Sequence, residues 1–147
     1  MQQDESDLKR ILEILQFSRK DDFKAYFFKY FIQSEVFATR METKVSVIFV
    51  PHNWTHVFLR DGKYFDMQRA QRMPWILEAL QRPHEIREGY TLTRDVYLLT
   101  GKRLGEDFCV VVEKPNQNGK SHFITAFPLT VSSLQKIRMN PLIWQKE

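Results

Sequence analysis

The stretch Lys44-Val-Ser-Val-Ile-Phe-Val-Pro51 is where the hydrophobic pattern of the chain changes from a helical to a strand period. Val45 to Val50 is a β-branched run that Pro51 ends, which is typical of a β-strand. Aromatic residues recur at helical spacing before it, and short apolar runs separated by turn residues follow it. This order predicts an α+β fold, with N-terminal helices followed by a twisted antiparallel β-sheet.

Two helices are expected before residue 44. Residues 7–17 repeat apolar side chains at i, i+3, i+4 and i+7, which predicts an amphipathic helix. A second helix opens at Asp21 and continues to about Phe37. Its aromatic stripe is interpreted as core-facing, because such rows are far more often packing than ligand sites. The stripe consists of Phe23, Phe27 and Phe31, with Tyr26 and Tyr30 beside it.

Alternation and turn signals predict the sheet. Thr55 to Arg60 alternates, and the Asp61-Gly62 dipeptide turns it into Lys63 to Asp66 as a hairpin, because both turn residues tolerate positive φ. Gln68 to Gln81 returns to a helical period, and the inserted helix is expected at Trp75 to Leu80, with Pro74 in its first turn. Further expected elements are strands at Thr93 to Thr100, Asp107 to Glu113 and His122 to Phe127, and a short helix at Ser132 to Met139.

Length and composition favour a single domain over the 147 residues, with 43% hydrophobic residues to build its core. Within it we expect a helical part at 1–43, a sheet core at 44–130 and a short C-terminal segment at 131–147. Cys109 is the single cysteine, which excludes an internal disulfide and fits a reducing compartment. No apolar stretch is long enough to span a bilayer, so a cytoplasmic protein without a membrane partner is expected.

Formal net charge is +4, a modest excess whose distribution matters more than its sum. Acidic residues crowd the first 25 positions, whereas Arg60 to Arg103 is rich in Lys and Arg. A polyanion partner is compatible with this basic region.

Metal and thiol chemistry are not expected. His52 and His56 have a ligand spacing only on a helix. No helix is expected there, because Pro51 precedes them and Thr55 to Arg60 alternates as a strand, so the two side chains have no reason to converge. Cys109 lies mid-strand, where cysteine behaves as a small buried hydrophobe. Neither a metal nor a cofactor is therefore predicted.

One constellation could handle phosphate without a metal. Period-2 geometry puts His56 and Arg60 on one strand face, and Ser121, Phe123 and Thr125 on one face of the last strand. An imidazole, a guanidinium and a hydroxyl on facing strands could grip a phosphodiester. The alternative is that His56 only satisfies a hydrogen bond and Thr125 is an ordinary strand former.

Residues 45–130 resemble the barnase–EndoU–colicin–RelE (BECR) group of metal-independent ribonucleases, particularly its phage- and toxin-associated branches. The resemblance rests on the strand Thr-His-Val-Phe-Leu-Arg, on Trp75-Ile-Leu-Glu-Ala-Leu-Gln-Arg-Pro-His-Glu-Ile86 and on Phe123-Ile-Thr-Ala-Phe-Pro128. It implies a twisted antiparallel sheet packed on helices, with a positively charged concave face that grips and cleaves RNA. The N-terminal helices lie outside it.

The resemblance also implies a site. His56 matches the strand-borne histidine, Thr125 the hydroxyl of the last strand, and Arg94 a basic residue on a middle strand. His56 would act as acid or base while the RNA 2′-hydroxyl attacks the phosphate, and Arg60 and Arg94 would clamp phosphate oxygens. The expected RNA contacts are Lys120, Arg72, Lys102 and, by stacking on a base, Tyr97 or Phe127.

The first hypothesis is therefore a toxin-like endoribonuclease that acts on cytoplasmic RNA and is restrained by a cognate inhibitor or antitoxin protein. A second is a non-catalytic RNA- or protein-binding module on the same fold. A third is a structural or regulatory protein whose aromatic N-terminal helices mediate assembly.

Overall fold

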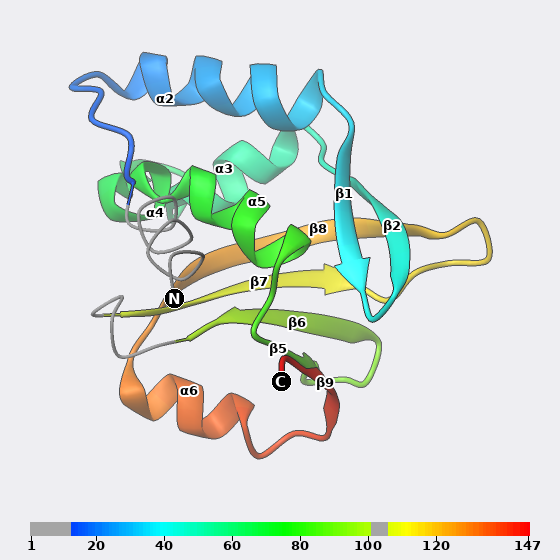
Figure 1. Cartoon of the computed structure of the whole chain (residues 1–147). Helices are drawn as coiled ribbons and strands as arrows, with labels where there is room; N and C mark the ends of the chain where they lie inside the picture. Colours follow the sequence, from blue (N-terminus) through cyan, green and yellow to red (C-terminus); the bar gives the residue numbers. More distant parts are fainter. Residues whose placement is uncertain (1–12, 101–105) are drawn as a thin grey trace, which may run out of the picture.

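A computed structural model of the chain describes residues 13–100 and 106–147 and has the α+β class predicted from the sequence. Seven strands form one sheet in the order β1-β2-β8-β7-β6-β5-β9. Helices α2 to α5 lie on one side of this sheet and α6 lies on the other (Figure 1). The sheet strands are β1 (Val36–Arg40), β2 (Thr43–Ile48), β5 (Glu85–Glu88), β6 (Arg94–Leu99), β7 (Asp107–Glu113), β8 (Lys120–Leu129) and β9 (Leu142–Gln145).

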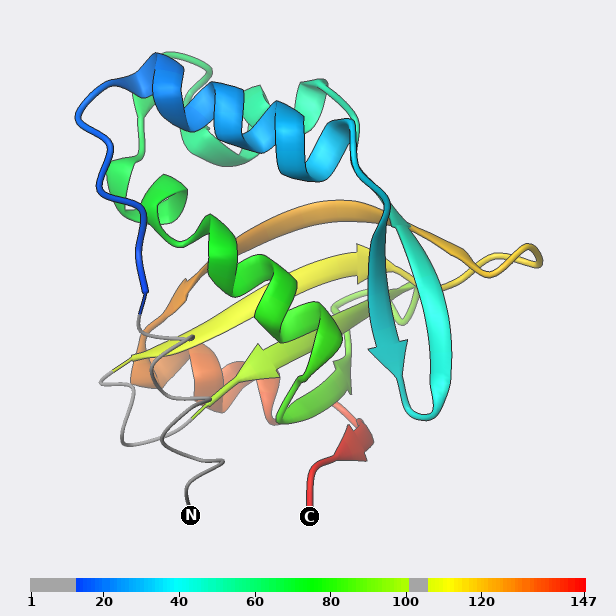
Figure 2. The same ribbon diagram turned by 45° about the horizontal axis from the view of Figure 1, so that its top comes forward.

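All neighbouring strands of the sheet are antiparallel except β2 and β8, which pair in parallel over Ser46 to Ile48. The prediction of an antiparallel sheet therefore holds for all but one of its strand pairs. The sheet curls, and the β1–β2 hairpin stands steeply against β7 and β8 beside α5 (Figure 2). This curl forms a concave side that holds α5.

The N-terminal part is less helical than predicted. Residues 13–17 of the expected first helix are not helical, and its residues 7–12 lie outside the described part of the chain. Backbone bonds to other elements replace the helical ones: the Leu15 amide donates to the Gln71 carbonyl at 2.9 Å, and the Glu13 carbonyl accepts from Trp75 Nε1 at 2.9 Å.

The second helix is shorter than expected. It forms α2 (Lys20–Phe27) and a π-helical turn (Phe28–Ile32). The next segment is β1, so the expected boundary at residue 44 is wrong. Val36 and Ala38 alternate into the core as strand residues, and Met41 at φ 59° turns the chain back into β2.

The expected strand at Thr55 to Arg60 is wrong, because residues His52–Phe58 form helix α3. Its buried side chains are Asn53, Trp54, Val57 and Phe58, a helical spacing that the apparent alternation concealed. Burial of these aromatics against α2 decides the conformation: Phe58 lies 5.5 Å and Trp54 6.1 Å from Phe27, between ring centroids. Tertiary packing thus overrides local β-propensity here.

The Asp61-Gly62 turn is confirmed, with φ of 54° and 71° at the two residues. The strands that it joins, β3 (Leu59–Arg60) and β4 (Tyr64–Phe65), have only two residues each and form a separate ribbon. The inserted helix divides at Arg72 into α4 (Met67–Gln71) and α5 (Met73–Gln81), with Pro74 in the first turn of α5 as predicted.

The second half of the chain follows the sequence prediction closely. Strands β6, β7 and β8 and helix α6 (Val131–Ile137) form where expected, with ends shifted by a few residues. Strands β5 and β9 were not predicted. Both are short, and β9, the edge strand, pairs with β5 through a register shift between Ile86 and Arg87.

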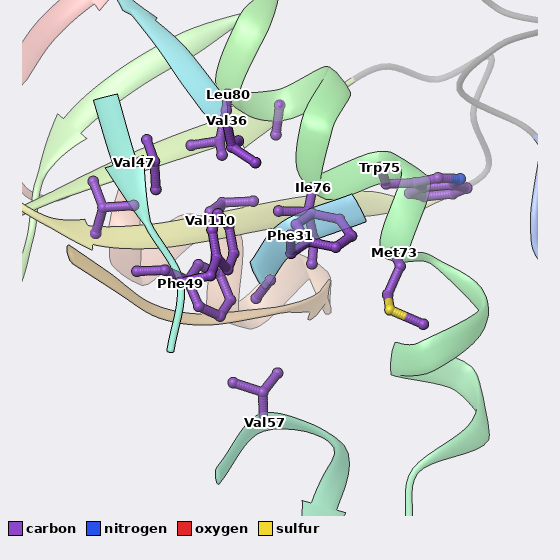
Figure 3. Packing of buried hydrophobic residues seen from close by; sticks show 14 of the residues in the cluster. Phe31, Val36, Val47, Phe49, Val57, Met73, Trp75, Ile76, Leu80 and Val110 are labelled. Carbon is purple, nitrogen blue, oxygen red and sulfur yellow. The ribbon is translucent and has the colours of Figure 1, made fainter. Parts of the chain in front are cut away.

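Two hydrophobic clusters lie on the two sides of the sheet. The larger joins the helices α2 to α5 to the side that we call the inner face, with Ile76, Phe49 and Val110 among its members (Figure 3). The smaller joins Leu134 of α6 to Leu98 and Cys109 on the outer face. Within residues 13–100 and 106–147, no helix is long and apolar enough to cross a membrane.

Candidate nucleic-acid interface

His56 and Thr125 do not meet. His56 is exposed on α3, whose buried side chains pack in the cluster of the inner face. Thr125 is the register partner of Val111, which packs in the cluster of the outer face. Because register partners share a face, the two residues lie on opposite sides of the sheet, and the predicted pairing is wrong.

A β-bulge explains why the sequence misplaced Thr125. Val112 pairs with Phe123 and Val111 with Thr125, so Ile124 is an extra residue in β8. Strict alternation would have put Phe123 and Thr125 on one face, whereas the bulge moves Thr125 to the other. The expected grouping of Ser121, Phe123 and Thr125 on one face therefore does not occur.

Four other residues of the predicted site either do not join Thr125 on its face of the sheet or lie outside the described residues. Arg60 is exposed in the short β3–β4 ribbon. Arg72 is held by Glu106, whose Oε1 accepts from Nη2 at 2.8 Å, and it lies over Trp75. Tyr97 is 0% exposed, so it cannot stack on a base, and burial raises the pKa of its phenol. Lys102 lies outside the described residues.

Arg94, Lys120 and Thr125 do share the outer face. Arg94 precedes Val96 by two positions in β6, and Val96 belongs to the outer cluster. Lys120 pairs with Ser46, which alternates with the inward-facing Val45 and Val47 of β2. The structure therefore brings three of the predicted site residues onto one side of the sheet, from β6 and β8.

His122 is the histidine of this face, and it was not predicted. It lies between the buried Ser121 and Phe123, is exposed, and pairs with Ile48 of β2. On the next strand Glu113, the register partner of Arg94, follows Val112, the register partner of Phe123. Neighbouring strands thus carry His122, Glu113 and Arg94 on the outer face. The sequence signal that could have found His122 is its position directly before Phe123, because neighbouring residues of a strand project to opposite faces.

The β1–β2 hairpin extends the same face with an aromatic residue and a further cation. Phe37 pairs with Ser46, itself the register partner of Lys120. Lys44 Nζ lies 4.2 Å from the centroid of the Phe37 ring. We call the set Lys44, Arg94, Lys120, His122, Phe37 and Thr125 the outer basic face.

The cations of the outer basic face are available to a ligand. Among the described residues, no hydrogen bond or ion pair engages the side chains of Arg94, Lys120 or His122. Glu113 is the nearby acidic residue, so the face is not uniformly positive. Helix α6 packs on the outer face at Leu98, Cys109 and Leu129, the end away from Lys120. At the other end, Arg94, Lys120 and His122 are exposed among the described residues.

A polar pocket of about 490 Å³ lies elsewhere, between β5, β9 and the end of α6. Its lining includes Glu85, which accepts from Arg87 Nε at 3.0 Å and from the guanidinium of Arg138. Burial opposes ionisation of Glu85, but these hydrogen bonds outweigh it and hold the pKa of its carboxyl below the usual value. Both arginines also tie α6 to β5, so this cluster has a structural role.

His84 lines the same pocket in a fixed tautomer. Its Nδ1 accepts from the Thr100 amide at 2.8 Å, so the proton of the neutral ring is on Nε2. Burial, with the nearby positive charge of Lys146, lowers the pKa of His84. The imidazole is therefore kept neutral in the folded protein.

In the described part of the chain, no group of three or more His, Cys, Asp or Glu side chains is placed to hold a metal ion. Comparison with known proteins adds no assignment. No protein-family model, curated protein or solved structure matches the chain. The resemblance to the BECR ribonucleases therefore stays a prediction.

Proposed function

We propose that the chain is a metal-independent endoribonuclease that binds single-stranded RNA on the outer basic face. The observation that carries the proposal is that His122, Arg94, Lys120 and Thr125 lie on one face of the sheet, with the first three exposed at the end away from the contacts of α6. Sequence-distant residues supply an imidazole, two cations and a hydroxyl there. Cytoplasmic RNA is the proposed substrate.

The proposed chemistry uses the substrate's own 2′-hydroxyl as the nucleophile. His122 exchanges the proton, since imidazole is the side chain suited to acid and base work near neutral pH. Glu113, on the adjacent strand, is the second proton carrier. Arg94 and Lys120 stabilise the charge that develops on the phosphate oxygens, and Thr125 donates a neutral hydrogen bond.

The hairpin end of the face supports single-stranded rather than double-stranded RNA. Phe37 is half-buried and carries Lys44 above its ring. An aromatic side chain beside cations is the usual platform on which an unpaired base stacks. Phe37 is the register partner of Ser46, and Ser46 is that of Lys120, so the aromatic ring lies on the same face as the proposed phosphate-binding cations.

A non-catalytic RNA-binding module is the second candidate, and the openness of the face favours it. His122, Glu113 and Arg94 are all exposed, and the polar pocket lies at another part of the sheet. Proton transfer is most effective where water is excluded. On this alternative the same residues bind RNA and leave it intact.

The two candidates differ in one measurable outcome. A 5′-labelled RNA oligonucleotide is incubated with purified protein in excess EDTA, and the product ends are identified. The proposal expects cleavage with 2′,3′-cyclic phosphate ends, loss of cleavage in His122→Gln, and an intact control when the oligonucleotide is the 2′-deoxy analogue. His56→Gln, an exposed histidine on the other side of the sheet, is the matched control and should cleave normally.

RNA binding without cleavage would support the second candidate and overturn the first. Cleavage that survives in His122→Gln but is lost in His56→Gln would indicate that the catalytic histidine is His56 on α3. It would contradict the assignment of the site to the outer face.

A further inference from the structure

His52 and His56 form an exposed histidine pair on one side of helix α3. They lie four residues apart, and their ring centroids are 6.2 Å apart with an angle of 24° between the ring planes. Residues i and i+4 of an α-helix are surface neighbours. The spacing carries no such meaning on a strand, so the helix itself creates this pair.

The backbone that carries the pair is anchored. Trp54, Val57 and Phe58 of α3 are at most 3% exposed and pack into the main core. Asn53 is also buried, and its Oδ1 accepts from the Val50 amide at 2.7 Å. The opposite side of the helix is therefore fixed, while the two imidazoles project into solvent.

The two rings are free to turn toward one ligand. Within the described residues, no hydrogen bond or ion pair engages either imidazole. Two imidazole nitrogens that bind one ion lie about 2.0–2.1 Å from it, which requires a short approach of the exposed ring ends. Rotation about the side-chain bonds supplies that approach without moving the anchored backbone.

We propose that His52 and His56 form a two-histidine chelate for a divalent transition-metal ion of the Zn²⁺, Ni²⁺ or Cu²⁺ class. Imidazole nitrogen suits these ions, whereas Mg²⁺ and Ca²⁺ take oxygen ligands. No third His, Cys, Asp or Glu joins the pair among residues 13–100 and 106–147, so water completes the coordination sphere. The chelate is separate from the outer basic face and independent of the proposed ribonuclease activity.

The test uses the untagged full chain with NiCl₂ as the probe. Binding is measured by isothermal titration calorimetry, and thermal unfolding is followed with and without Ni²⁺. A metal that binds the folded protein raises the unfolding temperature. We expect a calorimetric signal for one ion per chain and a raised unfolding temperature in the parent protein, and loss of both in His52→Gln and in His56→Gln.

Two controls distinguish binding by the His52–His56 pair from binding that depends only on the number of histidines in the chain. His122→Gln removes a histidine elsewhere and should bind Ni²⁺ as the parent does. The double variant His52→Gln with Thr55→His keeps the number of histidines but places them at adjacent positions, which do not face one another on a helix. It should lose binding.

Undiminished Ni²⁺ binding by either single variant, or by the double variant, would overturn the proposal. Equal stabilisation by MgCl₂ would do so as well, because two imidazoles do not select that ion.

Discussion

Arg40 Nε donates to Oδ2 of Asp95 at 2.7 Å and thereby joins β1 to β6, two strands that are not neighbours in the sheet. Asp95 is 0% exposed, and Lys114 Nζ donates to its Oδ1 at 2.8 Å. Lys114 also lies 2.8 Å from Oε2 of Glu88. A buried carboxylate is costly unless paired, and here it is paired with two cations, Arg40 of β1 and Lys114, which directly follows β7.

Removing Arg40 should destabilise the fold. Arg40→Ala leaves the buried Asp95 with one cation instead of two, and breaking a buried pair costs about 3–5 kcal/mol when one partner is lost. We expect the lower end of that range, because Lys114 remains. Urea unfolding measures it. Arg60→Ala, an exposed arginine, is the control and should change the unfolding free energy by less than about 0.5 kcal/mol. An equal loss of unfolding free energy in the two variants would show that the pairing of Arg40 with Asp95 does not stabilise the fold.

Charge removal on the outer basic face should weaken RNA binding in a salt-dependent way. Lys120→Ala and Arg94→Ala each remove one of the proposed phosphate contacts, so the magnitude of the slope of log K against log salt should fall by about 0.7 for a single strand. Fluorescence anisotropy at several salt concentrations measures this slope. Lys24→Ala on α2 carries the same charge change and should leave it unaltered. An unchanged slope in both outer-face variants would remove them from the interface.

His84 should make stability fall at mildly acidic pH. Burial lowers its pKa in the folded protein below the value of about 6.5 expected in the unfolded chain, so the unfolded chain takes up the proton first as the pH falls. The stability present above that value is lost progressively below it. Between pH 7 and pH 5, the free energy of unfolding measured in urea should fall less in His84→Gln than in the parent. The exposed His56→Gln should keep the parent's pH dependence.

Cys109 should be inert in the folded protein. It is 0% exposed, and burial raises its pKa to about 12, so almost no thiolate forms near neutral pH. A disulfide reagent that releases a coloured thiolate on reaction with a protein thiol should release none with the native protein at pH 7.5. It should release one equivalent per chain after denaturation in guanidinium chloride. Rapid native-state reaction would show that β7 opens readily, since the thiol cannot react while it is covered.

Two local features were within reach of the sequence. Asp61-Gly62 and Pro74 each constrain their own backbone, so the turn and the start of α5 lie where they were predicted. The β-branched run of β7 keeps its bounds because both of its faces are covered, by α5 and by α6. Composition and pattern also sufficed for the α+β class.

The arrangement of the candidate site could not be predicted from local sequence patterns. Whether residues 52–58 form a helix depends on Trp54 and Phe58 meeting Phe27 of α2, a contact between distant segments. The side on which Thr125 lies depends on a bulge that only the pairing of β7 with β8 creates. Arg94 and Lys120 were predicted from the sequence as site residues. That they share a face with His122 could not be predicted, because it depends on the order and register of the strands.

The sequence by itself determined the fold class, the sharp turns and most of the strands in the second half of the chain, because these depend on φ restrictions and on alternation over a few neighbouring residues. Only the tertiary structure decided which histidine joins Arg94 and Lys120, and that His52 and His56 share one side of a helix. The reason is physical: a single extra residue in a strand, or the burial of two aromatic rings, reverses the side from which a functional group projects.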